Sequence, residues 1–236
     1  SIELLISLFT AIANIFLGVA VFRKNKKSDT SKLFCLLTFT IAIWAITNYI
    51  SLQFSDPQTT LFWIRLIMAI AITMFALLFL LSLAFPLNKS PLKKRLSLFL
   101  FGDLFALQCL SLTPLIFADA QMTTSGNITP IPGPLMPIYG LHVLGYLIST
   151  IVVLLKKQKV SSGSNKAQIK LMLLGISLTF ILATISNFLL VVVFQFTQFV
   201  VFGPTISLIL IGAIAYAIIK HKFLDISQLV FRAISF

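Results

Sequence analysis

The chain has 236 residues, of which 58% are hydrophobic and only 10% are charged, and its mean hydropathy is +1.05. These values exclude an ordinary soluble domain, in which charged residues make up about a quarter of the chain. A formal net charge of +12 would suggest nucleic-acid binding in a soluble protein. Here the charge is confined to alternate connections between apolar runs, so no nucleic-acid partner is expected.

The apolar residues gather in seven long runs separated by short polar connections. A helix needs about 20 mostly apolar residues to cross the hydrocarbon core of a bilayer. By this criterion the sequence predicts transmembrane helices at residues 2–22, 33–54, 61–85, 96–117, 137–155, 171–195 and 199–219. The predicted fold is an all-α membrane protein, a seven-transmembrane helix bundle.

Two connections have a distinct composition. Residues 118–136 form the only long connection on their side, and their Thr, Ser, Gly and Pro content predicts an irregular cap over the bundle mouth. Residues 160–165 are rich in Ser and Gly, which predicts a flexible link on the opposite side.

The basic residues give the orientation. All Lys and Arg residues except Arg65 fall in every second connection or after the last run: Arg23, Lys24, Lys26, Lys27, Lys32, Lys89, Lys93, Lys94, Arg95, Lys156, Lys157, Lys159, Lys166, Lys170, Lys220, Lys222 and Arg232. By the positive-inside rule these segments are cytoplasmic, which places the N-terminus outside and the C-terminus in the cytoplasm. The sequence thus predicts a multi-pass protein of the cell inner (cytoplasmic) membrane, with basic loops against anionic lipid headgroups.

Polar and aromatic residues at the predicted outer level suggest a ligand site. Arg65 either extends to the outer headgroups or anchors an anionic ligand group or an acid such as Asp119. The predicted site lies beneath residues 118–136 and is lined by Trp44, Asn48, Arg65, His142 and Asn187. In the alternative interpretation, the aromatic residues form an interfacial belt and the polar ones join neighbouring helices.

Asp103 is the only acidic residue well inside a predicted span, about 10 Å from its cytoplasmic end at 1.5 Å per residue. Intramembrane carboxylates usually face the bundle interior or water, so Asp103 has either a structural hydrogen-bonding role or a signalling or proton-sensing role. His142 and Tyr146 are four residues apart and share a helix face. No histidine has ligand-spaced partners and no catalytic motif is found, so we expect no metal, cofactor or catalytic residue in this segment.

Two stretches carry a resemblance to a known family. The last run ends Ala215-Tyr216-Ala217-Ile218-Ile219-Lys220-His221-Lys222-Phe223-Leu224-Asp225-Ile226. This exit motif is similar to the ending of the N-terminal seven-helix sensor region of bacterial membrane histidine kinases, and Pro132-Gly133-Pro134-Leu135 resembles the PGPL stretch of that family. Phe85-Pro86 before a basic loop also fits. The resemblance implies a membrane region that receives a signal and a cytoplasmic part with a phosphotransfer or cyclase output.

The exit motif also has a physical interpretation as a coupling element. Lys220, His221 and Lys222 would hold the exit at the headgroup level, and with Asp103 and Asp225 they are the predicted signal-coupling residues. A one-sided apolar stripe follows at Ile226, Leu229, Val230, Ala233 and Ile234. This stripe predicts either a helix lying on the membrane or a signalling helix that pairs with a second protomer.

We therefore divide the chain into a seven-helix sensor domain, 1–222, and the start of a cytoplasmic signalling helix, 223–236, with an output domain beyond. The preferred function is the sensory module of a histidine kinase that detects a small or lipophilic ligand. The expected partners are membrane lipids, that ligand and a second copy bound through the C-terminal helix. A seven-span small-molecule transporter of the PQ-loop sugar-carrier type and a plain membrane anchor are the alternatives. Pro57-Gln58 lies in an outer loop and not in a span, which weighs against the transporter.

Overall fold

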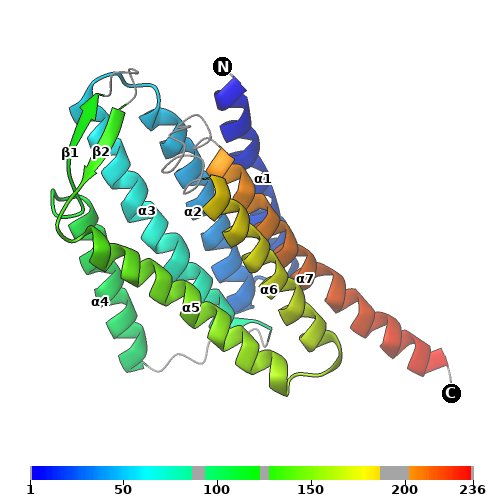
Figure 1. Ribbon diagram of the computed structural model, residues 1–236. Helices are drawn as coiled ribbons and strands as arrows, with labels where there is room; N and C mark the ends of the chain where they lie inside the picture. Colours follow the sequence, from blue (N-terminus) through cyan, green and yellow to red (C-terminus); the bar gives the residue numbers. More distant parts are fainter. Residues whose placement is uncertain (1, 87–93, 123–127, 187–201, 235–236) are drawn as a thin grey trace.

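A computed structural model describes residues 2–86, 94–122, 128–186 and 202–234. Over these residues the chain forms seven helices and a two-stranded sheet (Figure 1). In chain order they are α1 (Ile2–Lys24), α2 (Asp29–Ser51), α3 (Pro57–Ala84), α4 (Lys94–Ser111), β1 (Phe117–Met122), β2 (Ile128–Pro132), α5 (Met136–Val160), α6 (Gly163–Ala183) and α7 (Phe202–Ile234). The predicted helical bundle is confirmed, but the prediction of an all-α fold is wrong for the two strands.

Five helices in the described part of the chain are long and apolar enough to cross a membrane: α1, α2, α3, α5 and α6, the last with its apolar helix continuing to Ser186. Shorter apolar helical segments lie in the other two, Ser97–Ser111 in α4 and Gly203–Ile219 in α7. The chain is thus a multi-pass membrane protein.

Polar caps decide where two of the helices begin. The hydroxyl of Ser28 accepts a hydrogen bond from the backbone N–H of Ser31 at the start of α2. The carboxylate of Asp56 accepts bonds from the backbone N–H and the hydroxyl of Thr59 at the start of α3, and the hydroxyl bond, together with the backbone bond, holds the pKa of Asp56 below its usual value. Both helices start four residues before the predicted spans, because a helix can begin in the polar region outside its apolar run.

The flexible link predicted at residues 160–165 is wrong. Helix α5 continues to Val160 and α6 begins at Gly163, so that only Ser161 and Ser162 separate them. The backbone N–H of Ser161 donates to the carbonyl of Lys157, and Gly163 makes the turn with a positive φ of 55°. Helix α6 thus starts eight residues before the predicted span, because hydropathy detects the apolar part of a helix and not its polar extension.

The irregular cap predicted at residues 118–136 is also wrong, because this segment contributes to a β-hairpin. Strands β1 and β2 pair antiparallel, with Ala120 opposite Pro130 and Met122 opposite Ile128. Phe117, predicted as the end of a span, begins β1, because α4 already ends at Ser111. The hairpin packs against α3 and lies at one end of the bundle (Figure 1).

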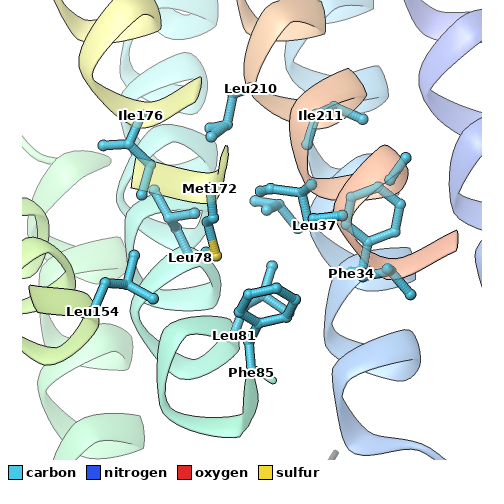
Figure 2. Close-up of a cluster of buried hydrophobic side chains, with 14 of the residues drawn as sticks. Phe34, Leu37, Leu78, Leu81, Phe85, Leu154, Met172, Ile176, Leu210 and Ile211 are labelled. Atoms are coloured by element: carbon cyan, nitrogen blue, oxygen red, sulfur yellow. The ribbon is translucent and has the colours of Figure 1, made fainter. Parts of the chain in front are cut away.

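The interior has two clusters of buried apolar side chains. In the larger one, side chains converge from α1, α2, α3, α5, α6 and α7, as Figure 2 shows for Phe34, Leu81, Leu154, Met172 and Ile211. The smaller one joins α3, α4, α5 and the hairpin through residues that include Ile72, Leu107, Ile116, Tyr139 and Tyr146. Helix α3 contributes to both clusters and packs on α2, α4, α5 and β1. It is therefore the central helix of the bundle.

The two ends of the bundle differ in charge. Arg23 and Lys24 lie in the last turn of α1, and Lys157 and Lys159 in the last turn of α5. Figure 1 shows both of these helix ends opposite the hairpin. We call the end that carries these four residues the basic end and the end formed by β1 and β2 the hairpin end. Such a separation is what the positive-inside rule requires of an inserted bundle.

Candidate functional site

A polar cluster joins α4 and α5 within the apolar part of the bundle. The hydroxyl of Tyr146 donates a 2.9 Å hydrogen bond to Oδ2 of Asp103, and Nε2 of His142 lies 3.4 Å from Oδ1 of the same carboxylate. As their spacing predicts, His142 and Tyr146 reach the same partner from one face of α5. They lie six and ten residues after Met136, or about 9 and 15 Å along a helix of about 37 Å. The cluster is therefore well inside α5 and away from both of its ends.

The hydrogen bonds of His142 determine what Asp103 and His142 can bind between them. Nδ1 of His142 is 2.9 Å from the carbonyl oxygen of Ile138, and a carbonyl can only accept, so Nδ1 carries a hydrogen. In the neutral imidazole, Nε2 then presents a lone pair toward Oδ1 of Asp103. Two facing acceptors repel unless a proton or a hydrogen-bond donor lies between them. Asp103 and His142 thus form a site for one proton or one donor group.

The cluster lies in an open groove of about 340 Å³ between α4 and α5. The groove is lined by Asp103, His142, Tyr146, Ser149, Gly145 and the apolar Phe79, Leu100 and Leu141. Phe79 of α3 lies beside Tyr146 in this lining, with ring centroids 6.1 Å apart. Helices α4 and α5 each pack on α3 but scarcely on each other, which leaves the groove open to the outer surface of the bundle.

Arg65 is held by the hairpin. Its Nε and Nη2 donate to the carbonyl oxygen of Phe117 at 3.1 and 2.6 Å, and Nη2 also donates to that of Ala118 at 3.3 Å. Asp119, the acid suggested as its partner, instead accepts a bond from Gln58. The guanidinium therefore binds the backbone of β1 to α3.

Among the described residues of the predicted ligand site, Trp44, Asn48 and Arg65 do not join His142. Asn48 donates to the carbonyl of Trp44 one turn earlier on α2, and Nε1 of Trp44 is buried without a hydrogen-bond partner among the described residues. Helix α3 separates α2 from the groove, and Asn187 lies outside the described residues. A common depth in the membrane did not place Trp44 and Asn48 on a surface that faces the groove, because depth does not fix the rotation of a helix.

The comparison with protein families addresses the whole chain. A family model described as the N-terminal 7TM region of histidine kinase matches residues 6–227. The chain belongs to this family. The match begins within α1, includes α2 to α6 and both strands, and ends within α7 just after the exit motif. It confirms the resemblance read from the sequence, and it covers the membrane part of such proteins and not a kinase part. No curated protein matches the chain.

In this 7TM region, the predicted coupling residues at the exit all lie on α7. Lys220, His221, Lys222 and Asp225 are part of its continuous helix, although their side chains are outside the described residues. One contact just before them is described: Nζ of Lys24, the last residue of α1, donates to the carbonyl of Ile219. Asp103, the remaining predicted coupling residue, lies in the groove between α4 and α5.

Sequence reasoning did not single out Lys157. Its Nζ donates to the carbonyl oxygens of Ser82, Leu83 and Phe85 at 2.9, 2.6 and 2.6 Å, at the C-terminal end of α3. The available signal was its position on α5, since the spacing of Tyr146, Thr150, Leu154 and Lys157 follows one helix face. The first three are buried, so the fourth points to the interior as well.

No metal centre is indicated. Within the ranges that the structure describes, no group of three or more His, Cys, Asp or Glu residues could hold a metal ion.

Proposed function

We propose that the chain is the sensory input module of a bacterial membrane histidine kinase and that it detects a small or lipophilic ligand in the groove between α4 and α5. The family match over residues 6–227 is the observation that carries the sensory assignment. The groove is the proposed ligand site because it combines a cluster of polar side chains with apolar walls inside the bundle.

In the proposed topology the bundle crosses the inner membrane seven times. The N-terminus lies outside and the C-terminus lies in the cytoplasm. The five long apolar helices and the two shorter apolar segments support this number. The separation of the basic end from the hairpin end supports the orientation, because Lys and Arg are retained on the cytoplasmic side.

The proposed route of the signal runs from α5 to α7. Helix α5 packs on α6, and α6 packs on α7, whose apolar residues share the larger core cluster with both. Because packed helices move as rigid bodies, a displacement of α5 would be passed to the exit. A ligand can cause it only by binding two arrangements of the bundle with unequal affinity.

The proposed output lies beyond residue 236. Residues 1–222 would be the sensor domain and residues 223–236 the start of a signalling helix that pairs with a second protomer. Helix α7 runs without a break from Phe202 to Ile234, which supports a rigid connection across this boundary. Lys24 at the end of α1 donates a hydrogen bond to the carbonyl of Ile219 on α7 and would couple the movement of these two helices.

The test uses the native full-length protein reconstituted in lipid nanodiscs. We expect it to transfer phosphate from ATP to its own histidine, and we expect Asp103→Asn to change the steady-state phosphorylation. A change of about 1.4 kcal/mol in the balance of two states alters their ratio about tenfold. Asp119→Asn is the matched control, because it makes the same chemical change in the hairpin. A full-length protein without kinase activity, or one that moves solutes into sealed vesicles, would contradict the proposal.

A further inference from the structure

We propose that the groove between α4 and α5 binds a single-chain amphiphile with a primary amine head group, with the amine held between Asp103 and His142. This inference rests on the proposed ligand site and names the chemistry of its ligand.

The head group is defined by the acceptors of the cluster. Oδ1 of Asp103 and Nε2 of His142 face each other at 3.4 Å. Two donors of the cluster are already engaged, since the hydroxyl of Tyr146 donates to Oδ2 of Asp103 and Nδ1 of His142 donates to the carbonyl of Ile138. An amine nitrogen has several hydrogens and can donate to both free acceptors. A carboxylate or phosphate head would be repelled by the carboxylate of Asp103, and the remaining hydroxyl donor of the lining is that of Ser149.

Charge balance favours an amine further. When Asp103 and His142 share one proton, the net charge of the pair is zero. An uncharged amine that enters from the lipid takes this proton onto its nitrogen, which becomes an ammonium group. Asp103 then carries the negative charge and His142 is neutral, so the net charge is still zero. No unpaired charge has to be buried in the bilayer, which would be costly.

The walls of the groove define the rest of the ligand. Its volume of about 340 Å³ is near the lower limit of about 300–1,000 Å³ for small-molecule pockets. Phe79 and Leu100 offer apolar contacts inside, and Leu141 at the rim is 68% exposed on the outer surface of the bundle. An open groove of this volume with an apolar rim suits one hydrocarbon chain that continues into the surrounding lipid.

The chain contains only two histidines, His142 and His221, which makes a direct test possible. The protein is labelled with nitrogen-15 histidine, placed in phosphatidylcholine nanodiscs and titrated with dodecylamine at constant pH. Imidazole nitrogen shifts report the protonation of each ring, and His221→Gln assigns the two sets of signals. We expect dodecylamine to shift the His142 signals saturably, and the bound form should carry its hydrogen on Nδ1. Dodecanoic acid should cause no saturable change.

Variants test the assigned contacts. Asp103→Asn should weaken dodecylamine binding by about tenfold or more, because a charge-assisted hydrogen bond is lost. Asp119→Asn is the control and should bind as the parent does. Leu141→Trp should block the groove and weaken dodecylamine binding. Because Leu141 faces the outer surface, this substitution should leave the core intact. It therefore provides the test if Asp103→Asn does not fold.

The inference is overturned if dodecylamine gives no saturable change, if dodecanoic acid binds equally well, or if neither Asp103→Asn nor Leu141→Trp weakens binding. The measurement reads the membrane chain directly and needs no kinase. If the protein has kinase activity but does not bind amines, only this inference is wrong. If it binds amines but has no kinase activity, only the proposed function is wrong.

Discussion

Three carbonyl oxygens at the end of α3, those of Ser82, Leu83 and Phe85, are hydrogen-bonded to the ammonium group of Lys157. The last carbonyls of a helix lack intrahelical partners and carry the negative end of the helix dipole. A cation at this position donates hydrogen bonds to these carbonyls and balances the negative end of the dipole. Lys157 belongs to the basic residues that indicate orientation, and the structure gives it a second role in holding α5 against α3.

Lys157→Met should therefore destabilise the bundle although the replacement is apolar and similar in length. Loss of hydrogen bonds from a charged donor costs about 1–3 kcal/mol, which corresponds to a fall in melting temperature of roughly 3–10 °C. Heating in detergent followed by size-exclusion chromatography measures the change. The control is Lys156→Met, which removes the same charge from the exposed neighbouring position. Equal melting temperatures for both variants would show that the contacts with α3 contribute nothing.

At the scale of elements, the PGPL stretch forms the junction between the hairpin and α5. The backbone N–H of Gly133 donates to the carbonyl of Ile116 at 2.7 Å, and that of Leu135 donates to the carbonyl of Leu115 at 2.8 Å. A Cβ atom on Gly133 would collide with the backbone carbonyls of Pro114 and Leu115. The glycine is thus required by the close approach of two backbone segments.

Gly133→Ala should separate these segments and destabilise the protein by about 1–3 kcal/mol, the usual cost of overpacking. The comparison is Gly140→Ala on α5, where an added Cβ meets no atom within 4 Å. That variant should keep or slightly raise the melting temperature, because alanine favours a helix more than glycine does. An unchanged melting temperature for Gly133→Ala would refute the assigned contact.

At the scale of the whole molecule, α3 separates two regions of different character. On one side, the larger core cluster joins α1, α2, α3, α5, α6 and α7. On the other, α4 and the hairpin pack on α3 and leave the groove beside α5. The proposed ligand site is thus in the more open part of the bundle, and the proposed signal route is in the more densely packed part.

The orientation of the bundle can be tested with single cysteines on a background that lacks Cys35 and Cys109. Thr129→Cys on β2 and Ser162→Cys between α5 and α6 both introduce a thiol at an exposed position. With a membrane-impermeant maleimide, Thr129→Cys should be labelled in intact cells and Ser162→Cys only after permeabilisation, because basic connections stay in the cytoplasm. Labelling of both from one side would contradict the proposed topology.

The sequence by itself determined the class of the protein, the approximate positions of its helices and its family. Hydropathy and charge are local properties of the chain, and a bilayer responds to them directly, so apolar runs predict membrane helices without knowledge of packing. The exit motif and the PGPL stretch carried the family, which the match over residues 6–227 confirms.

Only the tertiary structure decided which side chains meet. The sequence placed His142 and Tyr146 on one face of α5, but their contact with Asp103 depends on how α4 and α5 rotate against α3. The sequence left Arg65 either extending to the outer headgroups or anchoring an anionic group, whereas it binds carbonyls of a hairpin that hydropathy does not reveal. The rotation of a helix is fixed by its packing, and the partners of a polar group by the whole fold, so neither can be read from an apolar run alone.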